Sequence, residues 1–131
     1  MRILNFIKPL RERRIWERRK YPRVADCLNI DYKLANDIPH SYCVTRDISE
    51  GGVRLNLYQR MKIGTVLKLG IDLKDFTEPA WVIGKVVWAK ETPGREYPYE
   101  AGIEFSFLAN SFRSRIQNHI VGRMNDSHKK N

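Results

Sequence analysis

Short stretches in which apolar and polar residues alternate restrict the fold of this chain more than any other feature. Alternation with a period of two is typical of half-buried strands, and it first appears between residues 24 and 34. Turn residues separate this stretch from further alternating segments at 41–48, 53–57, 65–73, 80–90 and 99–107. Six short strands predict a mainly β fold, a small antiparallel barrel or sandwich. The absence of strand–helix–strand alternation argues against a doubly wound nucleotide-binding fold.

Two segments define the expected faces in more detail. In the second strand, Tyr42, Val44 and Ile48 form the apolar set and alternate with Cys43, Thr45 and Asp47. After Asn110-Ser111, a plausible N-cap, apolar residues recur every fourth position at Phe112, Ile116, Ile120 and Met124. This spacing predicts a C-terminal helix that packs its apolar stripe on the barrel.

The charge is distributed unevenly along the chain. The 131 residues carry a formal net charge of +9. Residues 1–23 hold nine bases and two acids (+7), residues 24–107 ten bases and twelve acids (−2), and residues 108–131 five bases and one acid (+4). We therefore expect a nearly neutral folded body and a basic N-terminal arm that could hold an anion.

Catalytic, metal and membrane signatures are missing from the sequence. His40, His119 and His128 lie far apart, and Cys27 and Cys43 fall on expected strands, where packing residues are more common than reactive thiols. No spacing typical of metal ligands, signal peptides or membrane spans occurs. We expect a cytoplasmic protein that is not an enzyme and has neither a metal nor a cofactor.

Two motifs stand out together. The first holds Arg19 and Arg23, four residues apart, and the second is the run Asp47-Ile48-Ser49-Glu50-Gly51-Gly52. If the first strand ends near residue 34 and the second starts near residue 40, antiparallel pairing sets Asp47 opposite Cys27. Both motifs then lie at one end of one hairpin.

The two motifs suit a guanine nucleotide with more than one phosphate. Arginine bridges phosphate oxygens or pairs with guanine O6 and N7, and a carboxylate accepts from guanine N1 and N2. A hydroxyl and glycines let a turn approach the ligand closely. A purely structural Asx turn with glycines is the alternative explanation of the second motif.

Arg-x-x-x-Arg followed by Asp-x-Ser-x-x-Gly resembles the paired signature of PilZ domains, bacterial receptors for cyclic di-GMP. The segments Val86-Val87-Trp88 and Ala101–Phe105 are similar to later strands of that family. The resemblance implies a six-stranded antiparallel β-barrel with a C-terminal helix. It divides the chain into a basic arm (1–17), a PilZ-like domain (18–124) and a flexible tail (125–131).

The same resemblance implies the site and the function. Cyclic di-GMP would be bound by Arg18, Arg19, Arg23, Asp47, Ser49, Gly51 and Gly52. Arg18 would favour a stacked pair of ligands over one. Binding would order the arginine arm and present a surface that includes Ile15 and Trp16 to an unidentified bacterial effector protein, with the receptor a monomer or a ligand-dependent dimer.

Two other functions stay open at this point. A PilZ-like adaptor would bind a protein partner without nucleotide, which the complete motifs argue against. A general nucleic-acid or anionic-surface binder would use Arg11, Arg13, Arg14 and the arm as a whole.

Overall fold

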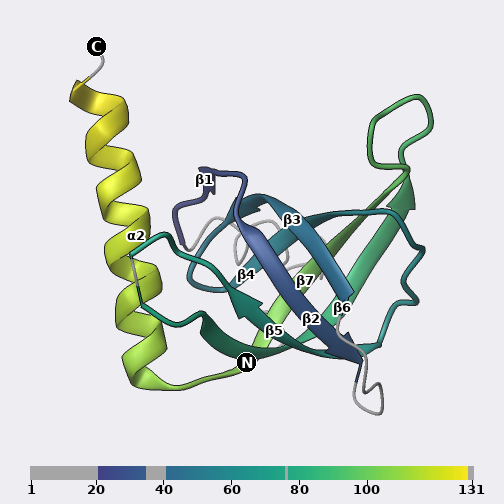
Figure 1. Ribbon diagram of the computed structural model, residues 1–131, viewed down its shortest axis with the longest axis horizontal. Coiled ribbons are helices and arrows are strands. Elements are labelled where there is room, and N and C mark those ends of the chain that lie inside the picture. The colour runs from purple at the N-terminus through teal and green to yellow at the C-terminus, as the bar shows by residue number, and fades with distance from the viewer. Residues whose placement is uncertain (1–20, 35–40, 76, 130–131) are drawn as a thin grey trace, which may run out of the picture.

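The computed structural model describes residues 21–34, 41–75 and 77–129, which form one sheet and one helix (Figure 1). The strands are β1 (Val24–Ala25), β2 (Asn29–Leu34), β3 (Ser41–Ile48), β4 (Gly52–Leu57), β5 (Val66–Ile71), β6 (Ala80–Glu91) and β7 (Tyr99–Leu108). The helix is α2 (Asn110–Lys129).

The strands follow the order β1-β3-β2-β5-β6-β7-β4, and every pairing is antiparallel. An additional β3–β4 pairing joins the two sides of the sheet, so strands β2 to β7 form a closed six-stranded barrel. Strand β1 adds two residues beside β2 on the same edge of β3. The predicted six-stranded antiparallel barrel with a C-terminal helix is confirmed.

The inside of the barrel is filled by the alternating apolar residues. Val53, Leu55 and Leu57 of β4 are buried, whereas Arg54 and Asn56 between them lie on the outer face. Burial of one such aliphatic side chain stabilises the fold by about 1.5–3 kcal/mol. The alternation thus defines both the core and an outer face of polar side chains.

Strand β3 differs from the sequence prediction. Cys43 and Thr45 are buried and Tyr42 is 73% exposed, so the predicted apolar set is wrong at Tyr42. The β2–β3 register pairs Ile30 with Cys43, whereas the predicted register pairs Ile30 with Val44. A register change of one residue exchanges the two faces of a strand.

A bulge between Thr45 and Asp47 exchanges the faces again near the end of β3. Ile48 therefore faces the core, as predicted, and Asp47 lies beside Arg54 on the outer face. The bulge is what brings the carboxylate of Asp47 to the outside of the barrel.

The expected first strand is interrupted between β1 and β2. Thr45 fills the interruption: its hydroxyl donates to the Asp26 carbonyl and accepts from Leu28 N at 2.9 Å, and its own N donates to Leu28 O. As a result Asp47 pairs with Ala25, and the predicted pairing with Cys27 is wrong. The prediction that Cys27 is a packing residue on a strand is also wrong, because this residue is exposed and lies between β1 and β2.

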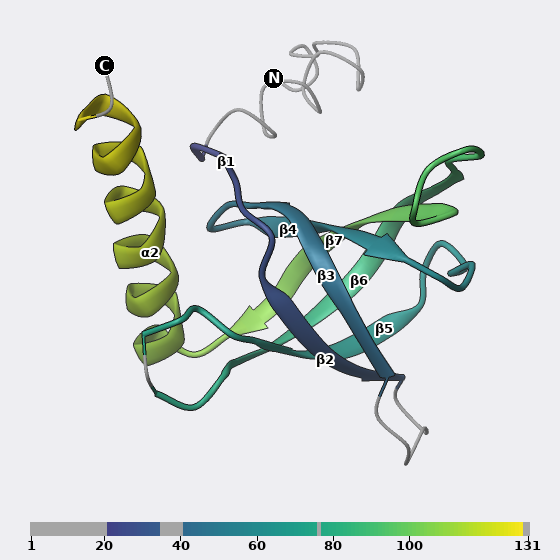
Figure 2. The same cartoon turned by 45° about the horizontal axis from the view of Figure 1, so that its top comes forward.

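Helix α2 stands along one side of the barrel, beside β1, and the β6–β7 hairpin lies on the other side (Figures 1 and 2). Ile116 and Ile120 of the predicted stripe are buried, Phe112 is half-buried against the core, and Met124 is 37% exposed. The helix continues to Lys129, through most of the expected tail. In the described part of the chain, no helix has both the length and the apolar composition that a membrane crossing requires.

Candidate ligand-binding site

Residues 21–23, the described end of the arginine motif, lead into β1 beside the turn of residues 49–52, here called the glycine turn. A Cβ atom on Gly51 would lie 3.2 Å from Cδ2 of Tyr21, so the Tyr21 ring packs against the turn. Val24 and Ala25 then pair with Ile48 and Asp47. The side chain of Arg23 is exposed, and the predicted site residues Arg18 and Arg19 lie outside the described residues.

The turn itself is held by its own hydrogen bonds. Ser49 N donates to Gly52 O at 2.9 Å, and Gly51 N donates to Ser49 Oγ at 3.2 Å. Gly51 O also accepts from Phe105 N of β7 at 2.9 Å. Ser49 thus has a structural role in the turn, and its hydroxyl stays at the surface of a preformed loop.

Gly52 is required by the close pairing of β4 with β7. A Cβ atom here would lie only 2.2 Å from the carbonyl oxygen of Ile103, because β4 and β7 approach each other closely at this pair. Gly52 therefore permits the strand pairing that brings the turn onto the barrel. Any ligand contact at this residue comes from its backbone.

Asp47 and Arg54 form the central ion pair of the site. Arg54 Nε donates to Asp47 Oδ2 at 2.7 Å, and Nη2 donates to the same oxygen. Asp47 is 5% exposed because the guanidinium covers it. The hydrogen bond to Asp47 raises the pKa of Arg54. Sequence reasoning missed Arg54, although its place seven residues after Asp47 across a tight turn predicts cross-strand proximity.

A row of four cross-strand neighbours runs from this ion pair. Asp47 pairs with Arg54, Arg54 with Gly102, and Gly102 with Trp88, so the row crosses β3, β4, β7 and β6. A Cβ atom on Gly102 would lie 2.1 Å from Nε1 of Trp88, which shows that the indole lies across the glycine. The outer face therefore presents a carboxylate, a guanidinium and a half-buried aromatic ring in one line.

The next row contains a buried carboxylate. Glu100 of β7 is fully buried, pairs with Asn56, and lies 3.1 Å from Arg46 Nη1 and 3.4 Å from Lys90 Nζ. Glu100 Oε1 has no hydrogen-bond partner among the described residues. Two cations thus compensate one buried charge, as buried carboxylates require.

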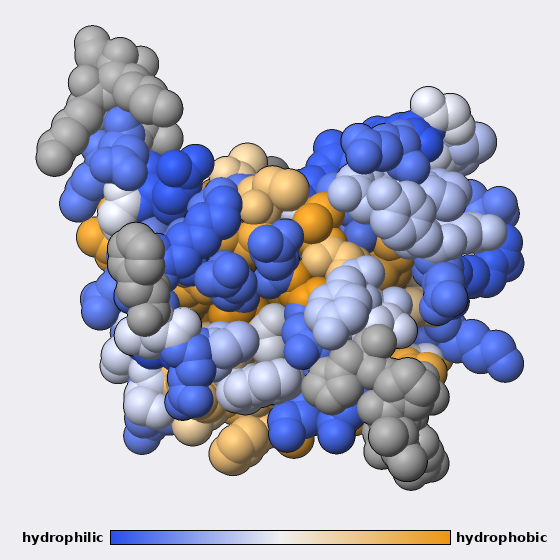
Figure 3. Space-filling model, in the orientation of Figure 1, coloured by the Kyte–Doolittle hydropathy of each residue, from blue (hydrophilic) through white to orange (hydrophobic). Residues whose placement is uncertain are grey.

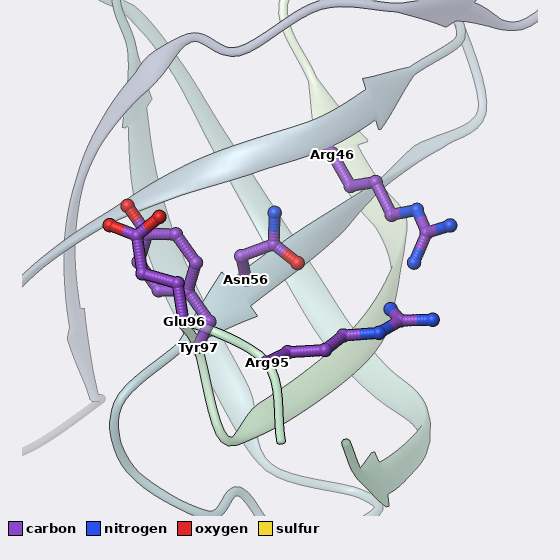
Figure 4. Close-up of a pocket in the computed structure, with 5 residues that line it drawn as sticks. All are labelled: Arg46, Asn56, Arg95, Glu96 and Tyr97. Atoms are coloured by element: carbon purple, nitrogen blue, oxygen red, sulfur yellow. The ribbon is translucent and has the colours of Figure 1, made fainter. Parts of the chain in front are cut away.

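A hollow of about 310 Å³ adjoins this second row, lined by Arg46, Asn56, Arg95, Glu96 and Tyr97. In Figure 4 the guanidinium groups of Arg46 and Arg95 extend in the same direction, Glu96 and Tyr97 lie on the opposite side, and the Asn56 amide lies between these two groups of side chains. The arrangement can accept an anionic group between two arginines and a hydrogen-bonding group at the amide.

The site has the chemistry of binding groups on a rigid face. Hydrophilic residues cover most of the face in Figure 3, with apolar residues gathered in its middle between helix α2 and the β6–β7 end.

The described residues contain no group of three or more His, Cys, Asp or Glu side chains arranged to hold a metal ion. Burial raises the pKa of Cys43 to about 12, consistent with a packing role.

Comparison with solved structures shows the same fold at low identity. MotI/DgrA of Bacillus subtilis superposes with a TM-score of 0.71 at 18% identity, over 82% of this chain and 52% of that one. The PilZ domain of YcgR from Escherichia coli gives a TM-score of 0.68 at 15% identity, over 86% and 96%. MrkH of K. pneumoniae gives 0.60 at 17% identity, over 86% and 55%. The chain thus spans about half of the MotI/DgrA and MrkH chains.

A search of curated proteins found no match to the sequence. The family model described as the PilZ domain, in contrast, matches residues 17–122, most of the barrel and helix. This match covers well over half of the chain, and it agrees with the closed barrel and with the two motifs at its end. The chain therefore belongs to the PilZ-domain family.

Proposed function

We propose that this protein is a receptor for cyclic di-GMP that acts through contacts with another protein. The observation that carries the proposal is the packing of Tyr21, inside the arginine motif, against Gly51 of the Asp47–Gly52 turn. This contact supports a clamp in which the arginine motif and the Asp47–Gly52 turn hold the nucleotide from two sides. The E. coli YcgR PilZ domain and K. pneumoniae MrkH, which share the fold, were solved with c-di-GMP.

Asp47 would recognise one guanine. Its Oδ2 atom already accepts from Nε and Nη2 of the planar Arg54 guanidinium, two adjacent N–H donors comparable to N1 and N2 of guanine. A bound guanine would share or replace these donors, and Arg54 would then be free to pair with a phosphate or with O6 and N7. Ser49, Gly51 and Gly52 would contact the ligand at the surface of the turn.

Arg18, Arg19 and Arg23 would hold the phosphates and the guanine faces. Arginine donates bidentate, charge-assisted hydrogen bonds to phosphate, and its plane stacks on bases. Residues 1–17 would then act as an arm that cyclic di-GMP orders against the domain of residues 18–124, with 125–131 as a tail. A shift of Trp16 fluorescence on ligand addition tests this step, and the shift should disappear in the Trp16→Phe variant.

Isothermal titration against cyclic di-GMP, GTP and the linear dinucleotide tests the proposed function. We expect cyclic di-GMP to bind with a dissociation constant of about 1 µM, equivalent to about −8 kcal/mol, and the other two compounds not to bind. The molar ratio of the titration shows whether one ligand or a pair is bound. Absence of heat with cyclic di-GMP at low salt would contradict the proposal. Equal competition by any phosphate polymer would instead indicate a general anion binder.

The adaptor alternative requires a separate measurement. If Arg19→Ala combined with Arg23→Ala leaves binding of the protein partner unchanged with and without nucleotide, the chain acts as an adaptor. We expect the double variant to lose nucleotide binding and, with it, the ligand-dependent partner interaction.

A further inference from the structure

Helix α2 contacts the segment that leads from the arginine motif into β2 (residues 24–28, here called the arm root) through His119 and Arg123. His119 Nε2 lies 2.8 Å from Asp26 Oδ2, and Arg123 Nε lies 3.3 Å from the same oxygen. Asp26 follows Arg23 by three residues and directly follows Ala25, the strand partner of Asp47. The side chains of Asp26 and His119 are each only 12% exposed, so solvent screens this contact weakly.

The same helix also contacts the glycine turn. Gln117 Nε2 donates to Glu50 Oε1 at 2.7 Å, and Glu50 stands between Ser49 and Gly51. Helix α2 thus contacts both the arm root and the glycine turn, through His119 and Gln117, which are two positions apart in the sequence. In both ribbon views α2 runs beside β1 (Figures 1 and 2).

The contact at Asp26 reaches the centre of the site through the backbone. The Asp26 carbonyl accepts from the hydroxyl of Thr45, and Thr45 stands two residues before Asp47 on β3. Thr45 is 1% exposed and also bonds Leu28 N, so it has no room to move independently. A displacement of Asp26 therefore acts on the strand that carries the guanine-recognising carboxylate.

We infer that helix α2 is a brace that fixes the arm root and the glycine turn relative to each other, with Asp26, His119 and Gln117 as positioning residues for nucleotide binding. The inference rests on the proposed function. Because coupling between two sites is reciprocal, the bound nucleotide also holds the helix against the barrel.

The chain offers a matched control on the same helix. Arg115 forms a two-bond ion pair with Asp75 in the β5–β6 connection, at 2.9 and 3.0 Å, and touches neither motif. Arg115→Ala removes a polar helix–barrel contact of the same kind as His119→Ala and Gln117→Ala. Loss of helix packing in general should therefore affect all three variants.

Titration calorimetry with cyclic di-GMP compares the variants on the full chain. We expect His119→Ala and Gln117→Ala to weaken binding by at least about fivefold, the lower end of typical coupling between sites. His119→Gln, whose amide can still donate to Asp26, should restore most of the affinity, and Arg115→Ala should leave it within about twofold. Unchanged affinity in both brace variants, or an equal loss in Arg115→Ala, overturns the inference.

Hydrogen exchange of the free protein separates this inference from the proposed function. His119→Ala should speed amide exchange at residues 24–28 and Gln117→Ala at residues 49–52, and Arg115→Ala should change neither segment. If the unsubstituted protein does not bind cyclic di-GMP, the proposed function fails, and these exchange rates still decide whether the brace exists. Unchanged exchange in both brace variants rejects it.

Discussion

Gly51 and Gly52 are adjacent in the sequence but meet different neighbours. A Cβ atom on Gly52 would overlap a strand carbonyl at 2.2 Å, whereas one on Gly51 would meet a Tyr21 ring carbon at 3.2 Å. A backbone atom held in a sheet cannot move away, but an aromatic ring can shift by a few tenths of an ångström. A side chain at Gly52 should therefore affect the stability of the barrel, and one at Gly51 the position of Tyr21 in the arginine motif.

Alanine at each glycine should reveal this difference. We expect Gly52→Ala to destabilise the protein by about 1–3 kcal/mol, as overpacked sites do, and Gly51→Ala to have little effect on the melting temperature. Gly51→Ala should instead weaken cyclic di-GMP binding, because it displaces Tyr21 between the motif arginines. Thermal melts with titration of both variants check this, and equal melting temperatures would contradict the assignment.

The two cysteines differ in exposure. Cys27 is exposed, whereas Cys43 is buried, with its pKa raised to about 12 by burial. Because only the thiolate reacts, we expect iodoacetamide at pH 8 to modify Cys27 alone in the native protein and both residues in urea. Mass spectrometry of the labelled protein measures this. Labelling of Cys43 at the rate of Cys27 without denaturant would show that β3 opens.

At the level of elements, Arg115 ties α2 to the β5–β6 connection. Its hydrogen bonds lower the pKa of Asp75 from 3.8 to about 2. A carboxylate with a lowered folded-state pKa contributes stability above about pH 4, and that contribution is lost as the pH falls towards 2. Since the pair is partly exposed, its contribution is at most about 1 kcal/mol.

Arg115→Ala should therefore be less stable than the parent protein at pH 5 and equally stable at pH 2. Urea unfolding at the two pH values measures the difference. Asn118→Ala, an exposed position on the same helix, serves as the control and should change the stability by the same amount at both pH values. A deficit that persists at pH 2 would assign the stabilisation to packing instead of to the ion pair.

The β2–β3 hairpin shows why part of the fold was predictable and part was not. The number of strands follows from the spacing of apolar residues and turns, which is a local property. The register of β3 differs from the predicted one by one residue against β2 and changes again at the bulge between Thr45 and Asp47, and neither feature has a signature in the alternation. Asp47 was therefore assigned the wrong partner, although it was placed at the correct end of the hairpin.

The site was predictable only where a motif marks it. Asp47, Ser49 and the glycines lie in one short run, which forms the end of β3, the following turn and the start of β4. Arg54 and Trp88 reach the same face by strand pairing, and His119 reaches Asp26 across 93 positions of sequence. Contacts of this range come from packing, so sequence reasoning had no signal for them.

For the whole molecule, the uneven charge predicts a dependence on salt. Residues 1–23 carry +7, against −2 for residues 24–107. The screening length falls from about 10 Å at 0.1 M salt to about 3 Å at 1 M, so attraction between the arm and a phosphate should weaken. We expect cyclic di-GMP affinity to fall several-fold over this range, measured by titration. An affinity independent of salt would show that the arginines contribute little.

The closure of the barrel by β3 and β4 has a mechanical consequence. Each of the six strands β2 to β7 is hydrogen-bonded on both sides, so the strands form a hoop, and one strand cannot slide without breaking rungs on two neighbours. A closed barrel of this kind resists the sliding of one strand past the next. We therefore expect structural changes on ligand binding at the end of the barrel, where the turn, the two residues of β1 and the helix meet.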